Sequence, residues 1–178
     1  MEIHALIKKI ISFGLMIIGC FLLQTTVFSN FKLAGVTPNF LVILVSYIGF
    51  MRGRKDGMVV GIVCGILLDL FIGSVFGLYS IIFLFLGYLN GLLRQFFFGD
   101  DIKLPLFLVG ISDIVYGLFI YFALFLFRGR ADFLYYVMNI ILPEAVYTIV
   151  ISILLYYPMI RLNTWLDKKD KRGAGSIV

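Results

Sequence analysis

Charged side chains are scarce in this sequence. Asp, Glu, Lys and Arg make up 14% of the 178 residues, whereas soluble domains carry about 25%. Hydrophobic residues make up 62%, and the mean hydropathy is +1.07. A soluble fold of this length would lack the polar surface needed to cover itself, so the sequence predicts an integral membrane protein.

Residues that commonly carry chemistry are also few. The one histidine, His4, lies in the N-terminal flank, where we expect it to be solvated or interfacial. Both cysteines, Cys20 and Cys64, lie in apolar segments and are expected to act as small hydrophobic side chains, so no disulfide or metal site is indicated. The glycine-rich segments lie inside apolar helices and do not resemble phosphate-binding loops. We expect no enzymatic activity and no cofactor.

The apolar runs predict an all-α membrane protein, a compact bundle of six transmembrane helices. One domain is expected over residues 1–165, with a short basic cytoplasmic tail over 166–178. The first run continues past Cys20, so we interpret it as a membrane helix and not as a cleaved signal. The expected helices cover residues 8–28, 39–51, 57–72, 78–93, 104–127 and 143–157.

Two connecting segments have specific expectations. Residues 52–56 are expected to form a compact charged turn. Pro143 and Glu144 suit the first turn of a helix, so residues 131–141 are expected to be a separate interfacial or re-entrant piece. From Arg161 the chain is polar, and we expect disorder beyond Arg172.

The positive charges predict the orientation. With the N-terminus inside and the loops assigned alternately, the outer loops hold only three of the 15 Lys and Arg residues, Lys32, Arg128 and Arg130. The inner turn after the second helix carries Arg52, Arg54 and Lys55, which could also form a docking site. The positive-inside rule therefore predicts that both termini are cytoplasmic. Because topology accounts for the net charge of +5, no nucleic-acid partner is indicated.

Small residues recur every fourth position along the third helix. This spacing keeps them roughly on one helix face, where bare backbone allows close helix contact in lipid. We expect the face to pack another helix or to leave a groove or outer pocket for a partner, with this helix at the centre of the bundle. The residues are Gly57, Gly61, Gly65, Asp69, Gly73 and Gly77.

Three acidic residues lie within predicted spans, where a carboxylate should face protein or water. Asp69 is expected either to accept hydrogen bonds from a neighbouring helix end or to line a pocket. Asp113 shares a face with Gly110 and Gly117, and it is expected to be hydrogen-bonded or protonated. A proton relay would need a second deep titratable group, and the sequence identifies none. Glu144 is explained by its place at a helix start.

Residues 51–80, MRGRKDGMVVGIVCGILLDLFIGSVFGLYS, closely resemble the signature region of the MreD family of rod shape-determining membrane proteins. The resemblance extends over roughly residues 10–160. Its other landmarks are Leu23 to Phe28, Pro38 before the second helix, and Pro143-Glu144-Ala145.

This resemblance implies a non-catalytic scaffold in the bacterial cell membrane. Proteins of this family bind the bitopic coiled-coil protein MreC. Through it they work with the glycosyltransferase RodA, a class B penicillin-binding transpeptidase and actin-like filaments in peptidoglycan synthesis.

The resemblance also implies a helix arrangement similar to the substrate-binding subunits of energy-coupling-factor transporters. A vitamin- or metabolite-binding transporter subunit is therefore the alternative function. It is disfavoured because few polar groups are available for a ligand pocket. A proton-coupled carrier using Asp113 is the third and weakest reading.

Overall fold

The computed structural model describes residues 2–32, 35–73, 75–96, 103–125 and 132–174. It confirms an all-α bundle of six helices. Two of these helices end in a π-helical turn, and a third contains one within its length. The elements are α1 (Glu2–Leu22) with a π turn (Leu23–Val27), α2 (Phe40–Arg52), α3 (Arg54–Phe71), α4 (Leu78–Leu93) with a 3-10 turn (Arg94–Phe96), α5 (Lys103–Ile120) with a π turn (Tyr121–Phe125), and α6 (Phe133–Tyr136), a π turn (Val137–Ile141) and α7 (Leu142–Ala174).

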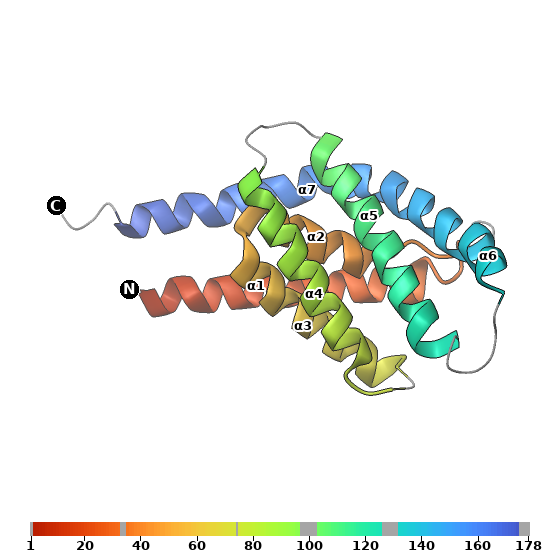
Figure 1. Ribbon diagram of the computed structural model, residues 1–178. Coiled ribbons are helices and arrows are strands. Elements are labelled where there is room, and N and C mark those ends of the chain that lie inside the picture. Colours follow the sequence, from red (N-terminus) through yellow and green to blue (C-terminus); the bar gives the residue numbers. More distant parts are fainter. Residues whose placement is uncertain (1, 33–34, 74, 97–102, 126–131, 175–178) are drawn as a thin grey trace.

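The two chain ends lie at the same end of the molecule. There α1 and α7 run side by side (Figure 1). Three helices are long and apolar enough to cross a membrane: Lys9–Val27, Lys103–Leu124 and Phe133–Arg161. The apolar helices α2 and α4 are shorter, with 13 and 16 residues.

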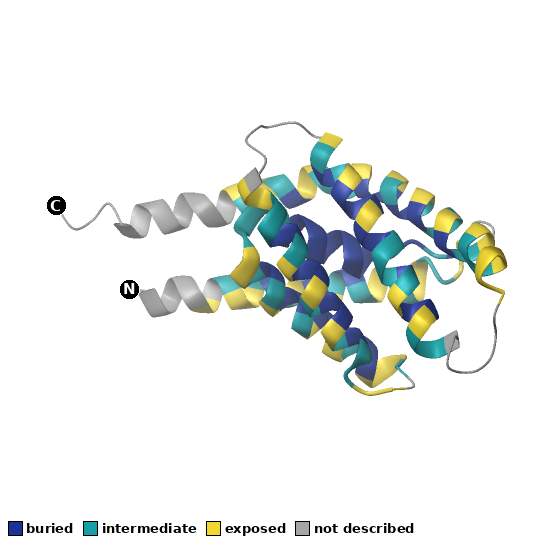
Figure 2. Ribbon diagram, in the orientation of Figure 1, coloured by how far each residue is buried: buried dark blue, intermediate teal, exposed yellow. Residues whose placement is uncertain are grey.

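The short helix α2 forms the core. Every residue from Phe40 to Gly49 is buried, so α2 has no exposed face over this stretch (Figure 2). Helices α1, α3, α4, α5 and α7 all contact it. A helix that is hydrophobic on all sides belongs in an interior. The expectation that the glycine-rich helix α3 occupies the centre is therefore wrong, since α3 exposes Val59, Val63 and Leu70 along its outer side.

The charged turn expected over residues 52–56 is also wrong. The connection between α2 and α3 is a single residue, Gly53, and Arg54 to Asp56 already belong to the first turn of α3. Gly53 has φ +98°, in the left-handed region where side chains are strained. This tight turn holds α2 and α3 antiparallel, with Gly57 against Gly49.

The last helix is continuous where the sequence predicted a break. Residues from Phe133 onwards are helical through the π turn, which includes a bond from the Leu142 N–H to the Val137 carbonyl. Proline clashes with the carbonyl four residues earlier, and the wider π turn relieves that clash before Pro143. The helix also extends to Ala174, two residues into the segment beyond Arg172 that was expected to be disordered, and the rest of that segment lies outside the described residues. The turn expected at Arg128 and Arg130 lies outside the described residues.

Candidate functional sites in the bundle

The glycine face of α3 is covered by α4 of the same chain. A Cβ atom on Gly57 would lie 2.6 Å from the Gly87 carbonyl oxygen, and one on Gly61 would meet the backbone of Phe83. A Cβ on Gly65 would meet the backbone of Ser80. The groove predicted from the spacing is therefore filled inside the chain by a backbone contact, the α3–α4 seam.

The last two members of the glycine series have a different setting. Gly77 precedes α4 with φ +91°, and no described atom lies within 4 Å of the position its Cβ would take. At Gly73 a Cβ would meet only the backbone of Asp69, in its own turn. The seam thus ends at Asp69, and Gly73 and Gly77 belong to the connection between α3 and α4.

Asp69 binds the start of α4. Its carboxylate accepts hydrogen bonds from the backbone N–H groups of Tyr79 and Ser80, each at 3.0 Å, and from the Ser80 hydroxyl at 2.5 Å. The first N–H groups of a helix have no partner within it, and the helix dipole favours an anion there. Asp69 is 4% exposed. Its geometry is that of a helix cap supplied by the preceding helix.

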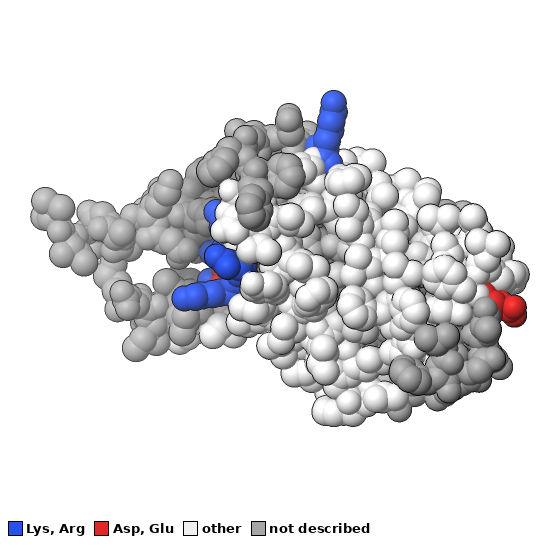
Figure 3. Space-filling model, viewed as in Figure 1, with Lys and Arg blue, Asp and Glu red and all other residues white. Residues whose placement is uncertain are grey.

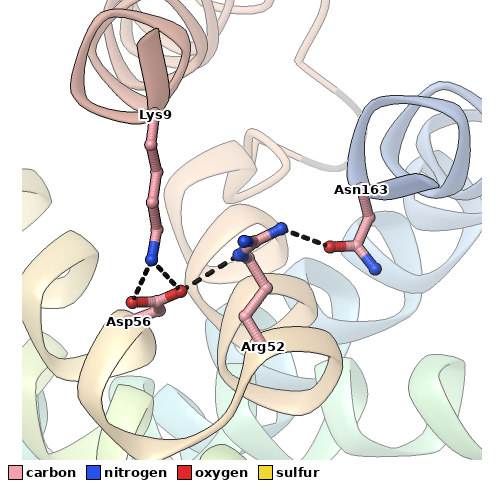
Figure 4. A network of polar contacts seen from close by, with 4 residues as sticks. All are labelled: Lys9, Arg52, Asp56 and Asn163. Atoms are coloured by element: carbon pink, nitrogen blue, oxygen red, sulfur yellow. Dashed lines mark hydrogen bonds and ion pairs between the residues drawn. The ribbon is translucent and has the colours of Figure 1, made fainter. Parts of the chain in front are cut away.

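At the end that holds the termini, an ionic network joins four helices (Figure 4). Asp56 of α3 pairs with Lys9 of α1 at 2.8 Å and with Arg52 of α2 at 3.0 Å. Arg52 also donates to the Asn163 side chain of α7 at 2.9 Å. Of the three cations predicted here, Arg52 lies in the network, whereas Arg54 and Lys55 are exposed. Sequence reasoning did not connect Lys9 or Asn163 to this turn, because they lie 47 residues from Asp56 and 111 residues from Arg52. The pairing of Arg52 with Asp56 is local, since the two residues are one helical turn apart.

Asp113 and Glu144 come from α5 and α7, two helices that pack on each other. In this helix pair, a Cβ on Gly110 would contact Ile149 and one on Gly117 would contact Ile141. Asp113 falls between these two glycines in α5 and is 2% exposed. Neither of its carboxylate oxygens has a hydrogen-bond partner among the described residues.

An open cleft of about 490 Å³ lies at the end of the bundle opposite the termini. It is formed where α1 and its π turn meet the following loop and the end of α3. Its lining combines apolar and hydrogen-bonding side chains: Phe21, Gln24, Thr25, Ser29, Lys32, Thr37, Phe71 and Ile72. Among the described residues, no three His, Cys, Asp or Glu side chains are grouped so that they could hold a metal ion.

The sequence model of the family described as rod shape-determining protein MreD matches residues 6–165. The chain belongs to the MreD family. No curated protein and no solved structure matches it. The match covers α2 to α6 in full and most of α1 and α7, and it includes the seam, the Asp69 cap, Asp113 and Glu144.

MreD-family membership gives the protein a role in rod-shape determination and associates it with the membrane machinery for cell shape. The family is one of structural, shape-determining proteins. The three long apolar helices agree with a membrane protein.

Alanine at Gly61 tests the seam. Because the new Cβ meets the backbone of Phe83, which cannot move without separating α3 from α4, we expect Gly61→Ala to destabilise the bundle by about 1–3 kcal/mol. Thermal unfolding in detergent measures this. Gly14→Ala, where no described atom lies within 4 Å, is the matched control and should be neutral. Equal melting temperatures for the two variants would contradict the seam.

The Asp69 cap predicts a graded response. Asp69→Ala removes all three hydrogen bonds and leaves the buried Tyr79 N–H and the partly buried Ser80 N–H unpaired, and a buried unpaired N–H costs about 1–3 kcal/mol. Asp69→Asn keeps one acceptor oxygen and should lose less. Hydrogen exchange at Tyr79 and Ser80, with thermal unfolding, measures both. Exchange as slow in Asp69→Ala as in the wild type would contradict the cap.

The ionic network predicts a salt-sensitive contribution to stability. Asp56→Ala leaves Lys9 without the carboxylate it binds, and we expect a loss of about 1 kcal/mol that shrinks as salt screens the pair. Thermal unfolding at low and high salt measures it. Lys55→Ala, an exposed neighbour, is the control. A loss in Asp56→Ala that does not change with salt would be inconsistent with an ionic contribution.

Proposed function

We propose that this protein is a non-catalytic membrane scaffold of the bacterial elongation machinery. It would bind an MreC-type bitopic coiled-coil protein and so link peptidoglycan synthesis to cell shape. A RodA-type glycosyltransferase, a class B penicillin-binding transpeptidase and an actin-like filament would be indirect partners. Family membership supports the role in rod shape, and the mixed lining of the open cleft supports a docking site.

We place the protein in the cytoplasmic membrane with both termini in the cytoplasm. Lys and Arg side chains gather at the end of the molecule that holds both termini, and a wide uncharged band follows (Figure 3). Arg54 and Lys55 lie in the first turn of α3, close to the Asp56 network. The positive-inside rule assigns this end to the cytoplasm. The cleft then opens on the outer side of the membrane.

The single observation that carries the partner proposal is the cleft, because the glycine seam is already filled. The lining of the cleft includes the apolar side chains of Phe21, Phe71 and Ile72. It also includes hydroxyl and amide groups and Lys32. A juxtamembrane segment has this mixed character, since it passes from lipid into water.

Helix α1 offers the adjoining path for the partner's membrane helix. Only 17% of its span is buried, against 39% and 33% for the other two long spans. Leu15, Ile18 and Leu22 are exposed along α1, which leads directly to the cleft. A bitopic protein could therefore contact the lipid-facing side of α1 and the cleft at the same time.

Phe71 and Phe76 form a matched pair for testing this site. They are 70% and 74% exposed, but only Phe71 lines the cleft. We expect Phe71→Ala to reduce co-purification of the MreC-type protein from native membranes by about tenfold, as for an aromatic contact at an interface centre. Phe76→Ala should leave it unchanged. Equal recovery with both variants, at equal membrane levels, would remove the cleft from the interface.

The same purification tests the alternative function. If a tightly bound metabolite and ATPase subunits are recovered in place of the coiled-coil protein, the fold serves uptake. The cleft would then be a ligand pocket, and its polar side chains would be the candidate contacts.

A further inference from the structure

The ionic network at the end that holds the termini carries more positive than negative charge. Lys9 and Arg52 both pair with Asp56, so two cations share one carboxylate and leave a net charge of +1 (Figure 4). The Arg52 side chain is only 9% exposed and is oriented by its bonds to Asp56 and Asn163. Lys9 Nζ and Arg52 Cζ lie 5.8 and 5.7 Å from the centre of the Phe13 ring. The excess positive charge is therefore held in a defined position.

Further cations surround the network. Arg54 and Lys55 are exposed in the first turn of α3. The Arg94 guanidinium group lies beside the turn between α2 and α3, 3.4 Å from the position that a Cβ on Gly53 would take. Of the acidic side chains that the structure describes, Asp56 alone belongs to this end of the bundle. This end therefore attracts ligands that carry negative charge.

A narrow apolar pocket lies directly beside the network, where α1, α2 and α7 meet. Arg52 and Asn163 line it, so the pocket and the network have two residues in common. Each of the three helices also contributes a methionine to the lining, Met16, Met51 and Met159. The free volume is about 10 Å³, and unbranched, flexible methionine side chains can widen such a gap for a hydrocarbon chain.

We propose that the network and this pocket together bind one anionic phospholipid. Its phosphate would contact Lys9 and Arg52, and the first part of an acyl chain would lie against the pocket methionines. The Arg guanidinium group matches phosphate geometry, and basic pockets between membrane helices are suited to anionic headgroups. An acidic peptide would use the cations but not the apolar pocket beside them. The inference rests on the proposed placement of this end at the cytoplasmic surface, and the site shares no residue with the docking cleft.

Native mass spectrometry of the full-length protein in detergent tests this site, because it measures the affinity of each bound lipid. The lipid is phosphatidylglycerol. Phosphatidylcholine with the same acyl chains has no net charge, and glycerol 3-phosphate has a phosphate without acyl chains. We expect the wild-type protein to bind one phosphatidylglycerol about fivefold or more tightly than phosphatidylcholine. It should bind no glycerol 3-phosphate over the same range of concentration.

Two substitutions in the network should change this affinity in opposite directions. Lys9→Gln lowers the net charge of the network from +1 to 0 and should weaken phosphatidylglycerol binding about fivefold. Asp56→Asn raises the net charge from +1 to +2 and should strengthen binding about fivefold, because the carboxylate no longer competes with the phosphate. The control is Arg161→Gln, which removes an exposed cation that lies over the Tyr157 ring and outside the pocket. It should bind as the wild type does.

Equal affinity of the wild type for the two phospholipids would overturn the proposal. Glycerol 3-phosphate binding as tightly as phosphatidylglycerol would also overturn it, since the ligand would then be a soluble phosphate ester. Lys9→Gln and Asp56→Asn both lose an ion pair, so a purely structural network predicts a change of the same sign in both, or none. Either result would contradict the lipid site. Recovery of the coiled-coil partner with the Phe71→Ala and Phe76→Ala variants is measured separately, so failure of the lipid site is distinguishable from failure of the scaffold proposal.

Discussion

The fold depends on the complete burial of α2, a helix too short to cross a membrane and without a polar face. Its first N–H groups lie inside the bundle, where water cannot bind them, and each unpaired group in lipid costs several kcal/mol. Three side chains supply the missing acceptors. Asn39 accepts from Val42, Gln24 of the α1 π turn accepts from Leu41, and Thr148 of α7 accepts from Asn39. The bonds from Gln24 and Thr148 therefore hold α1 and α7 against the first turn of α2.

The other helix contacts follow from the same environment. Lipid provides no hydrophobic force between helices, so close packing and hydrogen bonds must hold them together. The α3–α4 seam provides packing through bare backbone, and Asp69 closes the end of the seam where α3 connects to α4. Deeper in the bundle, Asn90 donates to the Ser112 hydroxyl at 2.8 Å and thus joins α4 to α5. In this protein, polar side chains join neighbouring helices by hydrogen bonds at specific positions, and glycines determine how closely the helix backbones approach each other.

The sequence predicted helix identities well because uninterrupted apolar runs allow little else, and the predicted range of α4, 78–93, matches the structure. The sequence analysis did not predict that α2 lies at the centre, although the sequence of α2 is uniformly apolar. It placed α3 there instead, because of the glycine spacing in α3. The predicted break at Pro143 was wrong because the π turn before it accommodates the proline within a continuous helix. No local sequence pattern predicts such a turn. The packing of α5, which carries Asp113, on α7, which carries Glu144, could not be predicted, because no local pattern determines which helices meet in three dimensions.

The two helix seams have different stiffness. At α3–α4, a Cβ on Gly57, Gly61 or Gly65 would meet backbone, so the helices cannot shift without breaking the contact. At α5–α7, Gly110 and Gly117 face the ends of isoleucine side chains, which can change rotamer. The second seam also has a π turn at the end of α5 and another before α7, and it contains the unsatisfied Asp113. The α5–α7 seam is therefore the less constrained of the two.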